Sequence, residues 1–171
     1  MRNLTKVMVL LSLLLSGAIF GFFYAWVCST MWGLDAADPR VAIAAMQAMN
    51  ASVRNVVFAP AFFGTPLALL LTAALLLRDG FRGGALGFAA GGVLYLFCGM
   101  VLTMTVNVPM NEMLATISVP EDIDAARTIW REYSGPWQLW NGLRTLASGT
   151  ALLAAAGGLI SMMTHGQKPA A

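Results

Sequence analysis

The chain has 171 residues, of which 58% are hydrophobic and 11% are charged. Soluble proteins carry about 25% charged residues, so this composition excludes an ordinary soluble domain and indicates an integral membrane protein. The net charge of +2 is small and dispersed along the chain, which argues against binding to nucleic acid.

Four apolar runs are each long enough to cross a membrane as a helix. A hydrocarbon core of about 30 Å needs about 20 helical residues, and the runs of this length cover residues 7–28, 56–77, 84–106 and 137–163. Arg2 and Lys6 precede the first run as in a signal peptide, but the run continues through "GFFYAWV" without an A-x-A cleavage site. We therefore predict a retained first span and a single all-α domain over residues 1–171, an antiparallel four-helix bundle.

Basic residues are distributed unevenly between the segments that flank these spans. The N-terminal tail, the second connection and the C-terminal tail hold one acid, Asp79, and five of the bases: Arg2, Lys6, Arg78, Arg82 and Lys168. The first and third connections hold the other seven acids. Because cytoplasmic segments are enriched in Lys and Arg, both termini are predicted to be cytoplasmic, in the inner membrane if the protein is bacterial.

Both extracytoplasmic connections are predicted to be helical. Asp38 is a good N-cap and Pro39 suits a first helical position, so a helix is expected over residues 39–52 that continues into the second span. Residues 120–133 alternate apolar and charged side chains at helical spacing, which predicts an amphipathic helix at the outer surface. Gly135 and Pro136 are expected to end it and to start the fourth span.

Small residues recur at four-residue intervals on two of the spans. Gly17 and Gly21 lie on the first span, and Gly83, Gly87 and Gly91 lie on the third. This spacing is typical of membrane helices that pack closely. The two cysteines, Cys28 and Cys98, form no C-x-x-C pair, and their predicted depths differ, so no disulfide is expected.

Polar side chains gather at the outer ends of the predicted spans. Trp137, Trp140, Asn141 and Arg144 have the spacing of one helix face. Arg144 follows Pro136 by eight residues, about 12 Å along the helix axis. Because an arginine near the bilayer centre costs about 2.5–3.5 kcal/mol, Arg144 either joins a polar cluster inside the bundle or extends to the outer surface.

The stretch "NVPMNEMLAT", which begins at Asn107, allows structural and chemical interpretations. Pro109 removes a backbone donor and disfavours helical geometry at Val108, so it ends or kinks the third helix. Asn107 then either caps freed backbone groups or faces the polar cluster. Glu112 falls in the first turn of a segment that starts at Pro109, where the helix dipole favours a carboxylate.

The residue inventory limits the chemistry. The only histidine, His165, lies in the C-terminal tail, so a histidine-ligated haem, zinc, copper or di-iron site is not expected, and no metal or other cofactor is predicted. The outer ends offer a carboxylate, a guanidinium, several amides and a set of aromatic and methionine side chains: Phe58, Phe62, Phe63, Met104 and Met110. This set suits a flat apolar molecule with an oxygen substituent.

Four segments together resemble one known family. The stretches "AMQAMNASVRNVVF", "FFGTP", "NVPMNEML" and "WQLWNGLR" are similar to successive signatures of the anthrone-oxygenase-like integral membrane family, whose bacterial members are mostly of unknown function. The resemblance implies four spans and an oxidation of anthrones to anthraquinones by molecular oxygen, with no evident metal or flavin. It also implies a pocket formed at Asn107, Pro109, Asn111, Trp140, Asn141 and Arg144, together with Asn50 and Asn55.

These observations give a hypothesis for the site. Oxygenation without a cofactor needs a base that removes a carbon-bound proton and donors that hold the resulting oxyanion. Glu112, with its pKa raised by burial, is the candidate base and Arg144 the candidate oxyanion donor. The candidate ligand-binding residues are Asn50, Asn55, Asn107, Asn111, Trp137, Trp140 and Asn141.

Other functions remain open at this point. A polar network could instead tie four helices together in a membrane scaffold, a partner subunit or a binder of hydrophobic molecules. A transporter or channel is less supported, because the cytoplasmic halves of the spans carry almost no polar residue along a path. The expected partners are membrane lipid, a hydrophobic aromatic molecule and oxygen, and a homo-oligomer is left open.

Overall fold

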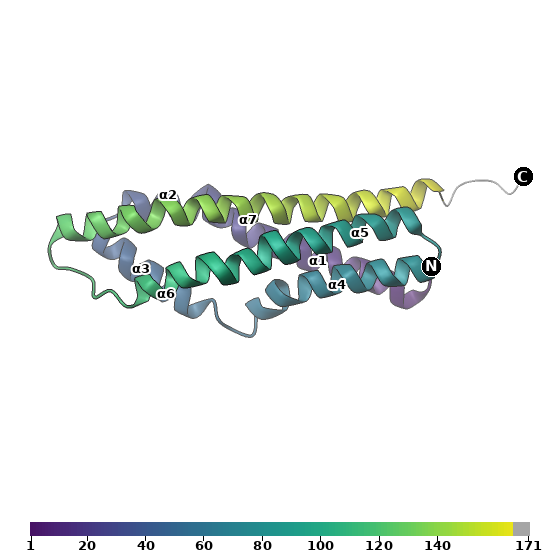
Figure 1. Cartoon of the computed structure of the whole chain (residues 1–171), viewed down its shortest axis with the longest axis horizontal. Coiled ribbons are helices and arrows are strands. Elements are labelled where there is room, and N and C mark those ends of the chain that lie inside the picture. Colours follow the sequence, from purple (N-terminus) through teal and green to yellow (C-terminus); the bar gives the residue numbers. More distant parts are fainter. Residues whose placement is uncertain (166–171) are drawn as a thin grey trace, which may run out of the picture.

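The computed structural model describes residues 1–165 and contains no strand among them. Four long helices form an antiparallel bundle (Figure 1). The first comprises α1 (Asn3–Ala25), the π-helical η1 (Trp26–Thr30) and α2 (Met31–Ala36), the second is α4 (Phe58–Arg78), and the fourth is α7 (Ile123–His165). The third comprises α5 (Arg82–Leu94), the π-helical η2 (Tyr95–Val101) and η3 (Thr103–Asn107), and α6 (Val108–Ala115). A shorter helix, α3 (Pro39–Ser52), lies between the first and the second.

Each long helix is long and apolar enough to cross a membrane; the candidate spans cover 3–36, 58–78, 82–115 and 123–163. The predicted fold class, an all-α membrane four-helix bundle, is confirmed. The start of α1 and the end of α7 lie at the same end of the bundle (Figure 1). We call the part of the bundle at this end the terminal half. The other part, which contains α2, α3, α6 and the start of α7, is the distal half.

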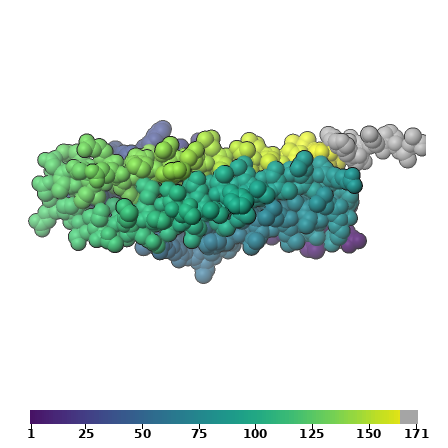
Figure 2. Space-filling view, viewed as in Figure 1, coloured from purple at the N-terminus to yellow at the C-terminus, as the bar shows by residue number. Residues whose placement is uncertain are grey.

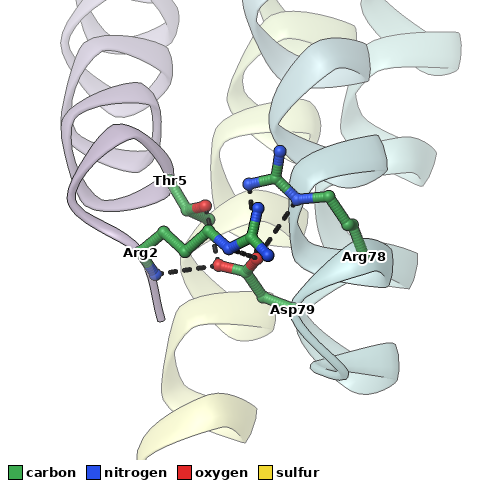
Figure 3. Close-up of polar contacts among 4 residues, drawn as sticks. All are labelled: Arg2, Thr5, Arg78 and Asp79. Carbon is green, nitrogen blue, oxygen red and sulfur yellow. Dashed lines mark hydrogen bonds and ion pairs between the residues drawn. The ribbon is translucent and has the colours of Figure 1, made fainter.

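In the terminal half, Asp79 connects the N-terminal segment to the end of α4 through hydrogen bonds (Figure 3). Its carboxylate accepts hydrogen bonds from the backbone N–H of Arg2 at 2.9 Å and the hydroxyl of Thr5 at 2.8 Å, and the Arg78 guanidinium donates to it at 3.3 Å. These donors lower the pKa of Asp79 from 3.8 to about 2, the Arg2 backbone bond contributing most. Lys168, which contributed to the predicted charge asymmetry, lies outside the described residues.

Glycines let α5 and α7 approach closely in this half. A Cβ atom on Gly87 would lie 2.5 Å from the carbonyl oxygen of Ala154 and 2.7 Å from the Cα of Gly158, so only glycine fits there. The packing role predicted for the third-span glycines is therefore confirmed at Gly87. It is wrong for Gly17 and Gly21 within this chain, because a Cβ at either position would meet nothing within 4 Å.

Three predicted helix boundaries are wrong. The helix at 39–52 does not continue into the second span, because α3 ends at Ser52 and a turn over 53–57 precedes α4. Of the two roles predicted for Pro109, ending the third helix is wrong, because that helix runs to Ala115. Gly135 and Pro136 do not interrupt α7, which is one helix of 43 residues.

The distal half explains why α7 is continuous through a proline. Ala126, Trp130, Tyr133 and Trp137 project from one side of α7 into a core that also contains residues of α2, α3 and α6. Gly135 and Pro136 lie on the exposed side. Packing on one face therefore fixes the helix on both sides of Pro136, and the missing backbone donor faces outward. The segment 120–133 accordingly contributes to a packed core.

Candidate functional site

A cavity of about 570 Å³ lies where the terminal and distal halves meet. It forms because α4 begins at Phe58, whereas the other three long helices continue past this level (Figure 1). Aromatic side chains from three of the long helices line it: Phe22, Phe23, Trp26, Phe58, Phe62, Phe63 and Trp137. Phe22 and Phe58 pack with ring centroids 4.8 Å apart, and Trp26 and Trp137 with centroids 5.1 Å apart. The cavity is therefore shaped for an apolar, ring-containing molecule.

The turn before α4 is held by Asn55. Its side-chain oxygen accepts the backbone N–H groups of Val57 and Phe58 at 2.8 and 3.0 Å, and its amide nitrogen donates to the carbonyl oxygen of Ser52 at 2.7 Å. These bonds satisfy backbone donors that a helix start leaves free. Asn55 lines the cavity, and its amide groups determine where α4 begins.

Arg144 forms the polar part of the wall. It lines the cavity and is only 5% exposed. Its guanidinium donates to Asn141 Oδ1 at 2.8 Å and to Thr103 Oγ1 at 3.3 Å, while its Nε has no partner. The guanidinium lies over the rings of Phe23 and Trp137, 4.6 and 5.3 Å from their centroids. Arg144 is thus held inside the bundle and does not extend to the outer surface.

No carboxylate compensates this buried charge. Among the described residues, the ion pairs join Asp or Glu to Arg2, Arg40, Arg54, Arg78 and Arg127, and none involves Arg144. A buried cation without an anionic partner is costly, and its favourable contacts here are neutral oxygens and two aromatic faces. The guanidinium can therefore bind an electron-rich oxygen that enters the cavity.

Asn141 positions Arg144 without lining the cavity. It is 1% exposed, and its amide nitrogen donates to the carbonyl oxygen of Phe23 at 3.1 Å while its oxygen accepts from Arg144. The side chain therefore connects α1 to α7 and fixes the guanidinium between them. This amide therefore acts on the cavity indirectly, through Arg144 and Phe23.

A second set of hydrogen bonds joins α3, α6 and α7 behind the cavity. Asn50 donates to the hydroxyl of Tyr133 at 3.3 Å, and this hydroxyl donates to Asn111 Oδ1 at 2.8 Å. Trp137 Nε1 donates to the same oxygen at 2.9 Å. Asn50, Asn111 and Trp137 all line the cavity, so the network both supports the wall and presents amide groups to its interior.

The sequence model of the anthrone oxygenase family matches residues 54–154. This range is more than half of the chain. The protein belongs to the anthrone oxygenase family. Comparison with curated proteins and with solved structures gives no match. The matched range includes α4, the third long helix and most of α7, so it covers Asn55, Arg144 and the polar network except Asn50.

The first long helix lies outside the range matched to the anthrone oxygenase family, yet it supplies Phe22, Phe23 and Trp26 to the cavity. Phe22 and Phe23 were not predicted to belong to the site, because the site residues were inferred from polar side chains at the ends of the spans. The spacing of Phe22, Phe23 and Trp26 puts all three near one face of a helix, which was the available signal.

Glu112 lies at the mouth of the cavity. Its side chain is 59% exposed and is paired with Arg54, which is 58% exposed, at an N–O distance of 3.2 Å. The burial that the hypothesis of a catalytic base assumed for Glu112 is therefore absent. Glu112 is nevertheless the only carboxylate among the cavity-lining residues.

The two remaining candidates lie outside the cavity of this anthrone oxygenase family member. Trp140 is half-buried on α7 and is not among the lining residues. Asn107 is fully buried in η3, and neither its side-chain oxygen nor its nitrogen has a hydrogen-bond partner. Asn107 therefore does not cap the end of a helix.

Backbone geometry near the cavity is unusual. The π-helical segments η1, η2 and η3 all occur at or next to cavity-lining residues. Such segments are rare and are frequent at functional sites. Within residues 1–165, no group of three His, Cys, Asp or Glu side chains is arranged to hold a metal ion. The site thus combines an aromatic cavity, a buried guanidinium and a peripheral carboxylate.

Proposed function

We propose that the cavity binds a hydrophobic aromatic molecule of the anthrone or quinol type and that the protein oxidises it with molecular oxygen. The observation that carries this proposal is Arg144, a buried guanidinium without a carboxylate partner in the wall of an aromatic cavity. An anthrone carries a carbonyl oxygen on a flat fused-ring body, so both parts of the molecule have a complementary surface.

For an anthrone, the proposed reaction starts with loss of a proton from the ring carbon opposite the carbonyl. The electron pair of the broken C–H bond moves onto the carbonyl oxygen, where Arg144 stabilises the developing negative charge. The electron-rich anion then reduces O₂. One oxygen atom becomes the second carbonyl of the anthraquinone and the other leaves as water, so one O₂ is consumed for each substrate.

Glu112 is the proposed proton acceptor, because it is the only carboxylate that lines the cavity. Its exposure and its ion pair with Arg54 mean that the proton can pass to water at the mouth. Asn141 and Thr103 hold the guanidinium in place.

The test is oxygen uptake by the purified protein with a panel of anthrones and quinols. Arg144→Leu is expected to lower kcat about 100-fold or more, because it removes an oxyanion donor. Arg131→Leu, at an exposed position of the same helix, is the matched control and is expected to retain full turnover. Wild-type turnover by Arg144→Leu would exclude the assigned role.

A second pair of variants tests the base. Glu112→Gln is expected to lower kcat about 100-fold, while Glu132→Gln, an exposed glutamate of α7 that does not line the cavity, is expected to have no effect. Equal rates for the two variants would remove Glu112 from the mechanism.

A non-catalytic binder of hydrophobic molecules is the second candidate, because the same cavity would serve it. Binding of an anthrone without oxygen uptake, in protein that retains its fold, would favour this candidate.

We further propose that the terminal half faces the cytoplasm and that the cavity opens on the opposite side. Arg2, Lys6, Arg78 and Arg82 all belong to the ends of helices in the terminal half, which supports this orientation under the positive-inside rule. A green fluorescent protein fused to the C-terminus is expected to fluoresce, since it folds in the cytoplasm. A dark but stable fusion would reverse the orientation.

A further inference from the structure

The length of α4 fixes the depth of the cavity in the membrane. This helix has 21 residues and is therefore about 30 Å long, which matches the thickness of a hydrocarbon core. Phe58 and Phe62, in its first two turns, line the cavity. A membrane that is spanned by α4 therefore surrounds the cavity at the edge of its hydrocarbon region.

The wall between α4 and the third long helix is incomplete at this depth. Packing between these helices involves α5 and η2 and falls away at η3 and α6. Phe63 of α4 and Met104 of η3 both line the cavity, and they are 49% and 47% exposed. They therefore form an apolar rim that faces outward from the bundle.

The turn over 53–57 adds apolar surface beside this rim. Val56 and Val57 are 87% and 85% exposed, the largest values among the exposed hydrophobic residues. In Figure 1 the turn projects from the side of the bundle between α3 and α4, and Figure 2 shows the same segment as a projection at the edge of the molecule. Exposed valines next to an apolar rim are favourable in lipid and unfavourable in water.

Toward the distal end of the bundle, the mouth is charged. The Arg54–Glu112 ion pair connects the turn to α6 at 3.2 Å, and both residues line the cavity. A molecule that entered from water would pass this pair, whereas one that entered from the bilayer would pass only the apolar rim.

We propose that the cavity takes its ligand sideways from the bilayer, between Phe63 and Met104, with Val56 and Val57 held in the lipid beside the opening. The ligands are then molecules that partition into membranes, which narrows the proposed function to substrates delivered by lipid. The inference rests on the proposed function only for the class of ligand, an apolar aromatic molecule.

Ligand entry can be tested by stopped-flow binding in proteoliposomes. The probe is 9-anthracenemethanol, which accepts energy from Trp26 and Trp137 in the cavity wall. Met104→Trp is expected to narrow the rim and to slow association and dissociation equally, by about tenfold, with Kd nearly unchanged. Met113→Trp, at an exposed position of α6 that does not line the cavity, is the matched control and is expected to leave both rate constants unchanged. Arg54→Gln breaks the ion pair at the mouth and speeds entry only if the ligand comes from water. Faster entry in Arg54→Gln with unaltered rates in Met104→Trp would overturn the proposal.

The position of the turn gives a second test that needs no ligand. Tryptophan fluorescence is quenched by lipids brominated on the upper part of the acyl chain. Val57→Trp is expected to add a component of tryptophan fluorescence that these lipids quench strongly. Thr116→Trp, at an exposed position at the end of α6, is expected to add a component that they do not quench. Equal weak quenching would place the turn in water and exclude the lateral opening.

These readouts separate the inference from the proposed reaction. Binding through the rim without oxygen uptake would leave the inference intact and reject the oxygenase. Failure of the probe to bind would reject the ligand class, and the quenching experiment would still decide the position of the turn.

Discussion

The two halves of the bundle use the same helices in opposite ways. In the terminal half, α5 and α7 approach until Gly87 and Gly158 nearly touch, and the buried hydroxyls of Ser12 and Thr72 bond each other at 2.8 Å. Where the two halves meet, aromatic side chains from three helices line a cavity of about 570 Å³. Asn107 and the Nε of Arg144 are buried there without partners.

This difference shows how one fold separates stability from function. Without a hydrophobic driving force between helices in lipid, association depends on close packing and on paired polar groups. The terminal half provides close packing at Gly87 and a bonded pair of hydroxyls at Ser12 and Thr72. The region around the cavity has open volume, and Asn107 and the Nε of Arg144 lack partners there. Such features cost stability and recur at functional sites. We expect a substitution that disturbs this close packing to destabilise the protein, and a substitution that removes an unpartnered buried group near the cavity to be tolerated or stabilising.

The largest effect is expected at Gly87. Gly87→Ala places a methyl group 2.5 Å from a backbone oxygen of α7, and because backbone cannot move aside cheaply, a loss of roughly 2–3 kcal/mol is expected. Gly17→Ala is the matched control, since that position is open, and no loss is expected. Thermal unfolding in detergent measures both, and equal midpoints would contradict the close packing of α5 on α7.

A smaller effect of opposite sign is expected at Asn107. Asn107→Leu removes a buried amide that makes no hydrogen bond, so a gain of about 1 kcal/mol in the free energy of unfolding is expected. In the terminal half, Thr72→Val leaves Ser12 without its partner, and a loss of about 1 kcal/mol is expected. The stability of the two variants can be compared by denaturation in a strong detergent. If both variants were destabilised, the buried amide of Asn107 would contribute to stability as the Ser12–Thr72 hydrogen bond does.

The same contrast explains what could be predicted from sequence. Spans are determined by the length of apolar runs, so the four-helix membrane fold followed directly, and Asp38 with Pro39 marked the start of α3 because capping is local. Arg144 could be placed below the surface by counting residues. The contacts of its guanidinium with the rings of Phe23 and Trp137 could not be predicted, because they depend on how α1 packs against α7.

The errors concern positions where tertiary packing overrides local signals. Pro136 is a helix breaker by local rules, but the buried face of Trp130, Tyr133 and Trp137 keeps α7 intact. Likewise Pro109 lies inside a continuous helix. The π-helical segments follow from shifted backbone hydrogen bonds, for which the residue pattern carries no signal. The hypothesis of a catalytic base assumed that Glu112 is buried, whereas the structure leaves it exposed and paired with Arg54.

The smallest effect on stability is expected from two aspartates, one in each half, whose pKa values are lowered to a similar extent. The pKa values of Asp79 and Asp38 are both lowered from 3.8 to about 2, Asp79 mainly by the backbone N–H of Arg2 and Asp38 mainly by the side chain of Arg40. A lowered pKa means that the charged form stabilises the fold. This stabilisation is complete above pH 3.8 and is lost as the pH falls toward 2.

Asp79 joins two helices, whereas Asp38 contacts a residue only two positions away, a local contact that can persist in the unfolded chain. Asp79→Asn is therefore expected to reduce the loss of stability between pH 4 and 2 more than Asp38→Asn does. Unfolding midpoints of the two variants, measured across this pH range, test this difference. Equal slopes would mean that Asp79 contributes no more to holding the terminal half together than a local turn does.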